Sequence, residues 1–138
     1  GKMVGKAEGE LPVSYNHIPL LMFGPDVKPQ LYDGLAQQVD IVPTVLGLLG
    51  LSYDYDGFGV DLLKTRRQMV FYSADNQIVA RDYKRCFVYN PNMQKAFYYD
   101  ALPKWKFRES HNYKSFEPLK KYVFAMEQTA QFMLNQQR

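Results

Sequence analysis

One histidine of this sequence stands where proton or anion chemistry is expected. His17 comes directly before an apolar run, residues 18–23, so its ring could point into a cleft at the edge of a sheet. An imidazole there could donate a hydrogen bond to a phosphate oxygen, or act as a proton donor near neutral pH. The alternative is a histidine at the end of a strand, satisfied by a neighbouring carbonyl group. No second ligand stands nearby in the sequence, so the residues alone leave both roles open.

The other candidates for chemistry are better explained as structural residues. Asp40 stands at the start of a helical pattern, and a role as helix cap accounts for it. Asp54 and Asp56 imitate part of a calcium loop, but the other ligand positions and the closing glutamate are missing, so we interpret them as a turn. His111 lies in a polar stretch and is expected at the surface. The sequence has no Ser/His/Asp set with a recognisable elbow, no Cys/His metal spacing and no glycine-rich phosphate loop.

A strand and a helix are the elements expected to position this histidine. Residues 18–23 form a continuous apolar run ended by a glycine and a proline, which predicts a strand buried on both faces. Pro19 lies at its start, where a missing backbone donor is tolerated. Asp40 then begins a helix that Gly50 ends, and this helix is predicted to pack back on the strand. Its apolar positions repeat at helical spacing: Val42, Val45, Leu46 and Leu49.

The second half of the chain predicts an antiparallel meander followed by a helix. Four short β-rich runs, MVFYS, QIVAR, RCFVY and KAFYY, are parted by polar turn residues. Residues 101–114 are predicted to form an irregular connection. Ser115 is then expected to cap a final helix, with Pro118 in its first turn. One apolar stripe of this helix should dock on the sheet: Leu119, Tyr122, Val123, Met126, Ala130 and Met133.

Composition narrows the class of protein. With 138 residues and 46% hydrophobic content, the chain can bury one core, so a single domain is expected. No apolar run approaches the about 20 residues of a membrane-spanning helix, so we expect no membrane contact by this segment. Tyrosines and basic residues in the β-rich runs raise the alternative of a surface that binds single-stranded nucleic acid. Because the basic residues do not gather on one strand face, a half-buried sheet face is preferred, without a nucleic-acid partner.

The central stretch resembles part of a known enzyme family. The apolar run is followed by Gly-Pro, a spacer, VDIVPTVLGLLG (residues 39–50), and then Gly59, Asp61, Leu62 and Leu63. This order is similar to the C-terminal part of sulfatase-like enzymes of the alkaline-phosphatase superfamily, in the branch of lipoteichoic acid synthases and phosphoglycerol transferases. RDYKR, residues 81–85, fits a strand–turn–strand of their small C-terminal sheet. The match covers about half of the chain in detail and most of it in outline.

The resemblance implies an α/β fold, namely the C-terminal segment of an alkaline-phosphatase-like domain. Residues 1–66 would complete the catalytic core, and residues 67–138 would form a small antiparallel sheet with a C-terminal amphipathic helix, as one compact unit with the core. The start Gly-Lys-Met-Val, without an initiator methionine, suggests a fragment. Its partner would be the missing N-terminal part of the catalytic domain. The expected location is extracytoplasmic, periplasmic or at the cell surface, on a membrane-associated parent protein.

The resemblance also implies a metal-dependent hydrolase or transferase for sulfate or phosphate esters. A Thr, Ser or modified Cys nucleophile and most ligands of a divalent Mn, Mg, Ca or Zn ion would lie upstream, so this chain alone is expected to be inactive. The single cysteine, Cys86, lacks the motif around a modified sulfatase cysteine. Lys6 and His17 would contact the anionic ester, although Lys6 is alternatively a solvated loop charge. The competing interpretation is a non-catalytic binding module, which an Asp-His pair directly before Gly1 would contradict.

Overall fold

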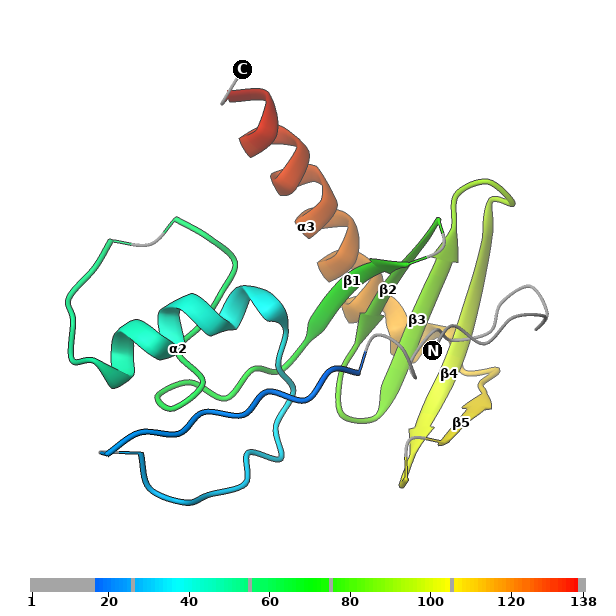
Figure 1. The fold of residues 1–138 in the computed structure, drawn as a ribbon. Coiled ribbons are helices and arrows are strands. Elements are labelled where there is room, and N and C mark those ends of the chain that lie inside the picture. The colour runs from blue at the N-terminus through cyan, green and yellow to red at the C-terminus, as the bar shows by residue number, and fades with distance from the viewer. Residues whose placement is uncertain (1–16, 26, 55, 75, 105, 137–138) are drawn as a thin grey trace.

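The chain forms a mixed α/β fold built on one antiparallel sheet. The computed structural model describes residues 17–25, 27–54, 56–74, 76–104 and 106–136. Within these ranges, five strands lie in the order β1–β2–β3–β4–β5, so each strand pairs with the next one along the chain (Figure 1). The strands are β1 (Val70–Ala74), β2 (Gln77–Arg81), β3 (Arg85–Asn90), β4 (Lys95–Leu102) and β5 (Lys106–Glu109).

The predicted four-stranded meander is confirmed, and the structure adds a fifth strand. Val79 pairs with Val88, and Phe87 pairs with Tyr98, so the β-branched and aromatic residues of the four runs lie opposite one another. The prediction of an irregular connection over residues 101–114 is wrong at β5. That strand is polar and mostly exposed at the edge of the sheet, so it carries little of the apolar alternation that marks a strand in a sequence.

The main core lies between the sheet and the C-terminal helix. A 3₁₀ turn, η2 (Tyr113–Phe116), leads directly into α3 (Glu117–Gln136), which therefore begins without the predicted cap by Ser115. The predicted apolar stripe is confirmed as the docking face over its first part, because Leu119 and Val123 are fully buried against the sheet and Tyr122 packs beside them. The buried residues of this core come from both layers: Ala80, Phe87, Phe116, Leu119 and Val123.

The opposite face of the sheet has a smaller apolar cluster. Val79, Cys86 and Val88 are fully buried there, and partly buried aromatic residues surround them. The alternation of a pleated strand explains the division, because neighbouring residues of β2 and β3 point to opposite faces. This arrangement confirms that the aromatic residues of the meander belong to half-buried sheet faces. The partly buried residues around this cluster are Tyr72, Phe97, Tyr99 and Phe107.

The helix predicted after Asp40 is present, but its apolar stripe does not face a core. A 3₁₀ turn, η1 (Gln38–Asp40), leads into α2 (Ile41–Leu48). Gly50 has a positive φ of 66°. Its N–H donates to Gly47 O at 3.1 Å and the N–H of Leu51 donates to Leu46 O at 3.1 Å, a Schellman end that confirms the predicted stop. The buried residues of α2 are Pro43 and Thr44, whereas Val42 and Leu49 remain largely exposed.

The strand predicted for residues 18–23 is wrong in this structure. The segment runs as an open, extended trace beside α2, and none of its residues joins a ladder with another described segment (Figure 1). Leu21 is 86% exposed and Phe23 is 94% exposed. A strand buried on both faces needs neighbours that take its backbone hydrogen bonds. The antiparallel sheet formed by residues 70–109 supplies no such neighbour to this segment.

Candidate functional site

The two residues predicted to contact an ester cannot be brought together in one described site. His17 is exposed and lies at the start of the extended segment of residues 17–25. Lys6 lies outside the described residues. The expectation that these two side chains face one anion therefore stays a prediction.

A buried ion pair, which the sequence did not reveal, organises the region around α2. The Asp40 carboxylate is fully buried, and the Arg67 guanidinium is 8% exposed. Arg67 Nε donates to Asp40 Oδ2 at 2.9 Å, and a second guanidinium nitrogen pairs with Asp40 Oδ1. Arg67 also donates to the carbonyl oxygen of Phe58 at 2.7 Å. Four side-chain and backbone donors thus surround two carboxylate oxygens, since the N–H groups of Gln37 and Val60 each reach Asp40 at 2.9 Å.

This geometry corrects the role predicted for Asp40. Its side chain makes no capping hydrogen bond to α2 and turns instead toward Arg67, although the residue does occupy the N-cap position. Burial and full pairing remove the carboxylate from any substrate, so its role is structural, as expected, but through an ion pair. The sequence could not predict this ion pair, because Arg67 lies 27 positions downstream of Asp40 and no local spacing rule links residues so far apart.

Thr44 and Asp61 extend the same polar cluster on the next turn of the fold. Thr44 Oγ1 donates to Asp40 O at 2.6 Å and accepts the N–H of Leu62 at 3.1 Å. Asp61 Oδ1 accepts the N–H of Leu63 at 3.0 Å, and Asp61 Oδ2 lies 3.4 Å from Lys64 Nζ. The bond from Leu62 to Thr44 ties the segment that contains Asp61 to the start of α2.

Gly47 leaves the space that the Asp61 carboxylate fills. A Cβ atom at position 47 would lie 2.8 Å from Asp61 Cγ and still closer to Oδ2. Alanine favours a helix over glycine by about 1 kcal/mol, so propensity alone would stabilise Gly47→Ala. We expect the opposite sign, a loss of about 1–3 kcal/mol from overpacking, measured by urea unfolding.

The matched control for this substitution is Gly24→Ala, where the new Cβ would meet only Val27 Cγ2 at 3.6 Å. That is an ordinary van der Waals contact, so the free energy of unfolding should change by no more than about 0.5 kcal/mol. A Gly47→Ala variant as stable as the native chain would show that Asp61 moves aside without cost.

A second feature that sequence reasoning missed is a tyrosine hydroxyl that joins three segments. Tyr83 Oη accepts the N–H of Leu35 at 3.3 Å and Arg66 Nε at 3.1 Å, and it donates to Arg67 O at 3.1 Å. Tyr83 lies in the β2–β3 turn, within the RDYKR stretch. Asp82 shapes this turn by accepting the N–H of Arg85 at 2.7 Å. The turn thereby fixes the segments on either side of α2 to the sheet.

The described residues include neither a metal-ligand cluster nor a reactive thiol. Among the described residues, no group of three or more His, Cys, Asp or Glu side chains is placed to hold a metal ion. Cys86 is buried without a disulfide. Burial raises the pKa of its thiol to about 12, so it stays a protonated thiol near neutral pH. It therefore lacks the thiolate that a cysteine nucleophile needs.

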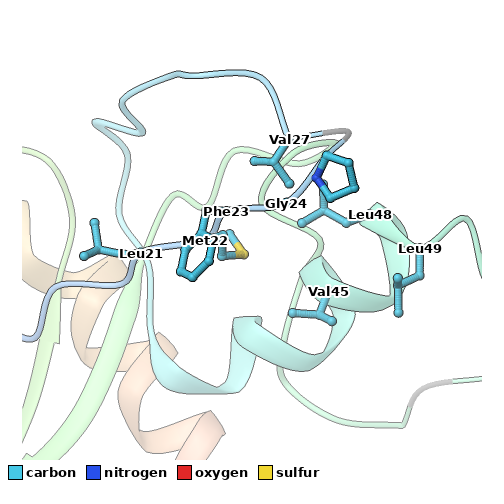
Figure 2. A pocket seen from close by; sticks show the side chains of 9 residues that line it. Leu21, Met22, Phe23, Gly24, Val27, Val45, Leu48 and Leu49 are labelled. Atoms are coloured by element: carbon cyan, nitrogen blue, oxygen red, sulfur yellow. The ribbon is translucent and has the colours of Figure 1, made fainter.

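A hollow beside the extended segment is apolar. It has a volume of about 440 Å³ and opens between that segment and α2 (Figure 2). Such a lining offers no charged group to an anionic ester, so the hollow does not fit the expected anion pocket. The lining residues that Figure 2 labels are Leu21, Met22, Phe23, Gly24, Val27, Val45, Leu48 and Leu49.

Two comparisons with known proteins gave no match to this chain. No known family profile matches the chain. No solved structure matches it either. In the part of the chain that the structure describes, no helix has both the length and the apolar character that crossing a membrane requires.

Proposed function

We propose that this chain is the C-terminal part of a sulfatase-like, metal-dependent enzyme of the alkaline-phosphatase superfamily. The reaction would be the hydrolysis or transfer of a sulfate or phosphate ester, in the manner of phosphoglycerol transferases and lipoteichoic acid synthases. The remaining, upstream part of the catalytic domain would be its partner. The parent protein would be membrane-associated and extracytoplasmic.

The observation that carries this proposal is the convergence of the motif residues. The VDIVPTVLGLLG and G-x-D-L-L segments contact each other, because Thr44 Oγ1 accepts the N–H of Leu62 and the Asp61 carboxylate fills the space beside Gly47. Two sequence segments that resemble one family thus depend on each other in the fold. This dependence explains why those residue types stand in that order, and it supports the interpretation of both segments as one motif.

The role proposed for this chain is support of the site, with Lys6 and His17 as its contacts to the ester. A divalent ion would supply charge stabilisation of the transferring group. The described residues do not form a ligand set for such an ion, because Asp40 pairs with Arg67 and Asp61 Oδ1 accepts the N–H of Leu63. The ligands of such an ion would therefore come from the upstream part of the catalytic domain.

The test compares this chain with the longer protein that the proposal requires. Both are assayed with an aryl sulfate and a phosphodiester in the presence of manganese, magnesium, calcium or zinc. The longer protein should turn over one substrate class and lose that activity to a chelator, whereas the 138-residue chain should give background only. Chelator-sensitive turnover by the 138-residue chain would contradict the assignment of the nucleophile and metal ligands to the upstream part. A longer protein without activity toward either class would contradict the proposed function.

A further inference from the structure

Two Asp-Gly pairs occur in the sequence, and this dipeptide can rearrange without an enzyme. The pairs lie in the closely similar stretches YDGL, residues 32–35, and YDGF, residues 55–58. Glycine has no Cβ atom to shield its backbone nitrogen, so this nitrogen can approach the carboxyl group of the preceding aspartate. Because the neighbouring residues are so similar, a difference in reactivity between the two pairs would come from the fold.

The fold restrains the first pair, Asp33 and Gly34. Asp33 Oδ1 accepts a hydrogen bond from Arg66 Nη2 at 3.2 Å. The hydroxyl of Tyr32 lies against Gly34, since a Cβ atom at position 34 would collide with it. The same hydroxyl donates to Leu35 O at 3.3 Å. Turning the Asp33 carboxyl group toward the glycine nitrogen therefore breaks existing contacts.

The second pair, Asp56 and Gly57, lacks such restraints. Both residues are exposed and belong to neither a helix nor a strand, whereas Gly34 is half-buried. Among the residues that the structure describes, the Asp56 carboxylate has no hydrogen bond or ion pair. Its carboxyl group can therefore rotate onto the nitrogen of Gly57 without losing a partner.

We propose that Asp56-Gly57 is a site of spontaneous aspartate isomerisation. The nitrogen of Gly57 forms a bond with Cγ of Asp56, and its proton leaves with the carboxyl oxygen as water, which gives a five-membered succinimide ring. Water then opens the ring at either carbonyl group, so the product has the same mass as the original chain. Opening at the α-carbonyl gives isoaspartate, in which the backbone runs through the side-chain methylene. The reaction requires only water, and the proposal does not depend on the proposed enzymatic function.

This isomerisation changes the backbone directly before the contacts to the buried ion pair. Phe58 follows the Asp-Gly pair, and its carbonyl oxygen accepts a hydrogen bond from Arg67 at 2.7 Å. Its ring packs edge-on against Phe71, with the ring centroids 5.9 Å apart. The N–H of Val60 donates to Asp40 Oδ1 at 2.9 Å. An added backbone methylene displaces these contacts, so we infer that the isoaspartate form is less stable than the native chain.

The test is incubation of the native chain near neutral pH for several weeks, followed by peptide mapping that separates aspartate from isoaspartate. An isoaspartate-specific methyltransferase with labelled S-adenosylmethionine supplies an independent count of the product. Isoaspartate should accumulate at residue 56 at least about fivefold faster than at residue 33, because even one exposed ion pair can restrain a group by about this factor. In urea, where the fold is lost, the two rates should become similar.

Two variants separate the effect of the fold from that of the reacting residues. Arg66→Ala releases Asp33, so it should raise the rate at residue 33 and leave the rate at residue 56 unchanged. Asp56→Glu should abolish the fast reaction at residue 56, because the longer side chain would have to close a six-membered ring. Unfolding curves confirm that both variants fold.

The stability of the product supplies a further readout. The isoaspartate form, enriched by chromatography, should unfold at a lower urea concentration than the unreacted chain. Equal rates at residues 33 and 56 in the folded chain would overturn the assignment of the site. A difference that persists in urea would overturn the role given to the fold. An isoaspartate form with an unchanged unfolding midpoint would overturn the link to the buried ion pair.

Discussion

Replacing Asp40 with asparagine should lower the free energy of unfolding by about 3–5 kcal/mol, because it leaves a buried guanidinium without its counter-charge. Arg67 is only 8% exposed, and in the native chain the fully buried Asp40 carboxylate accepts its Nε hydrogen bond. The amide of asparagine keeps the shape but supplies neither the charge nor the second acceptor. Urea unfolding followed by circular dichroism measures the change.

The control is an ion pair of the same residue types at the surface. Arg66 Nη2 lies 3.2 Å from Asp33 Oδ1, and the two side chains are 55% and 76% exposed. Asp33→Asn should cost no more than about 1 kcal/mol, because solvent screens an exposed pair. The double variant Asp40→Asn with Arg67→Met should recover part of the loss, since it removes the unpaired charge. Equal costs for Asp40→Asn and Asp33→Asn would contradict the structural role of the buried pair.

In the longer enzyme that we propose, His17→Ala and Lys6→Ala should each lower kcat/KM by about 100-fold. An effect of this size is typical when an enzyme loses one preorganised hydrogen-bond donor that stabilises the charge developing in the transition state. His17 meets one requirement for such a role, because it is exposed at the start of the extended segment and thus accessible to a ligand. The measurement is steady-state kinetics with the substrate that the longer protein turns over.

His111→Ala provides the matched control, because His111 is also exposed and its Nδ1 lies 3.5 Å from Tyr113 Oη. It should leave both kcat/KM and the free energy of unfolding unchanged. If the His17 and Lys6 variants keep full activity and native stability, this chain has no catalytic role beyond supporting the fold.

The elements that could be predicted are those whose pattern is local. The runs that became β1 to β4 alternate with polar turns, and Asn76 adopts the positive φ of 60° that suits asparagine between two strands. The stripe that includes Leu119 and Val123 identified the docking face of α3 for the same reason. A period of 2 or 3.6 residues can be recognised in a sequence without knowing which surface the element packs against.

The parts that could not be predicted depend on distant partners. The apolar run of residues 18–23 indicated a strand, but hydropathy does not say whether neighbouring strands exist. The sequence did not indicate the roles of Arg67 and Tyr83. The ion pair of Arg67 with Asp40 and the hydrogen bond from Leu35 to the Tyr83 hydroxyl join distant residues, so they arise only once the chain has folded. The same limit applies to His17, whose proposed ester contact needs groups that its neighbours in the sequence do not reveal.

The sequential order of the strands has a consequence for how the chain folds. Every strand of the sheet pairs with its neighbour in sequence, so each hairpin can close without a long loop. By contrast, the bonds from Asp40 to Arg67 and from Gln37 to Phe71 span 27 and 34 positions. Proteins with low contact order fold fast, whereas contacts between distant residues form later because closing a long loop costs more entropy. The hairpins of the meander are therefore expected to form first, and both the segment around α2 and α3, whose Tyr122 Oη donates to Met69 O across 53 positions, pack on them afterwards.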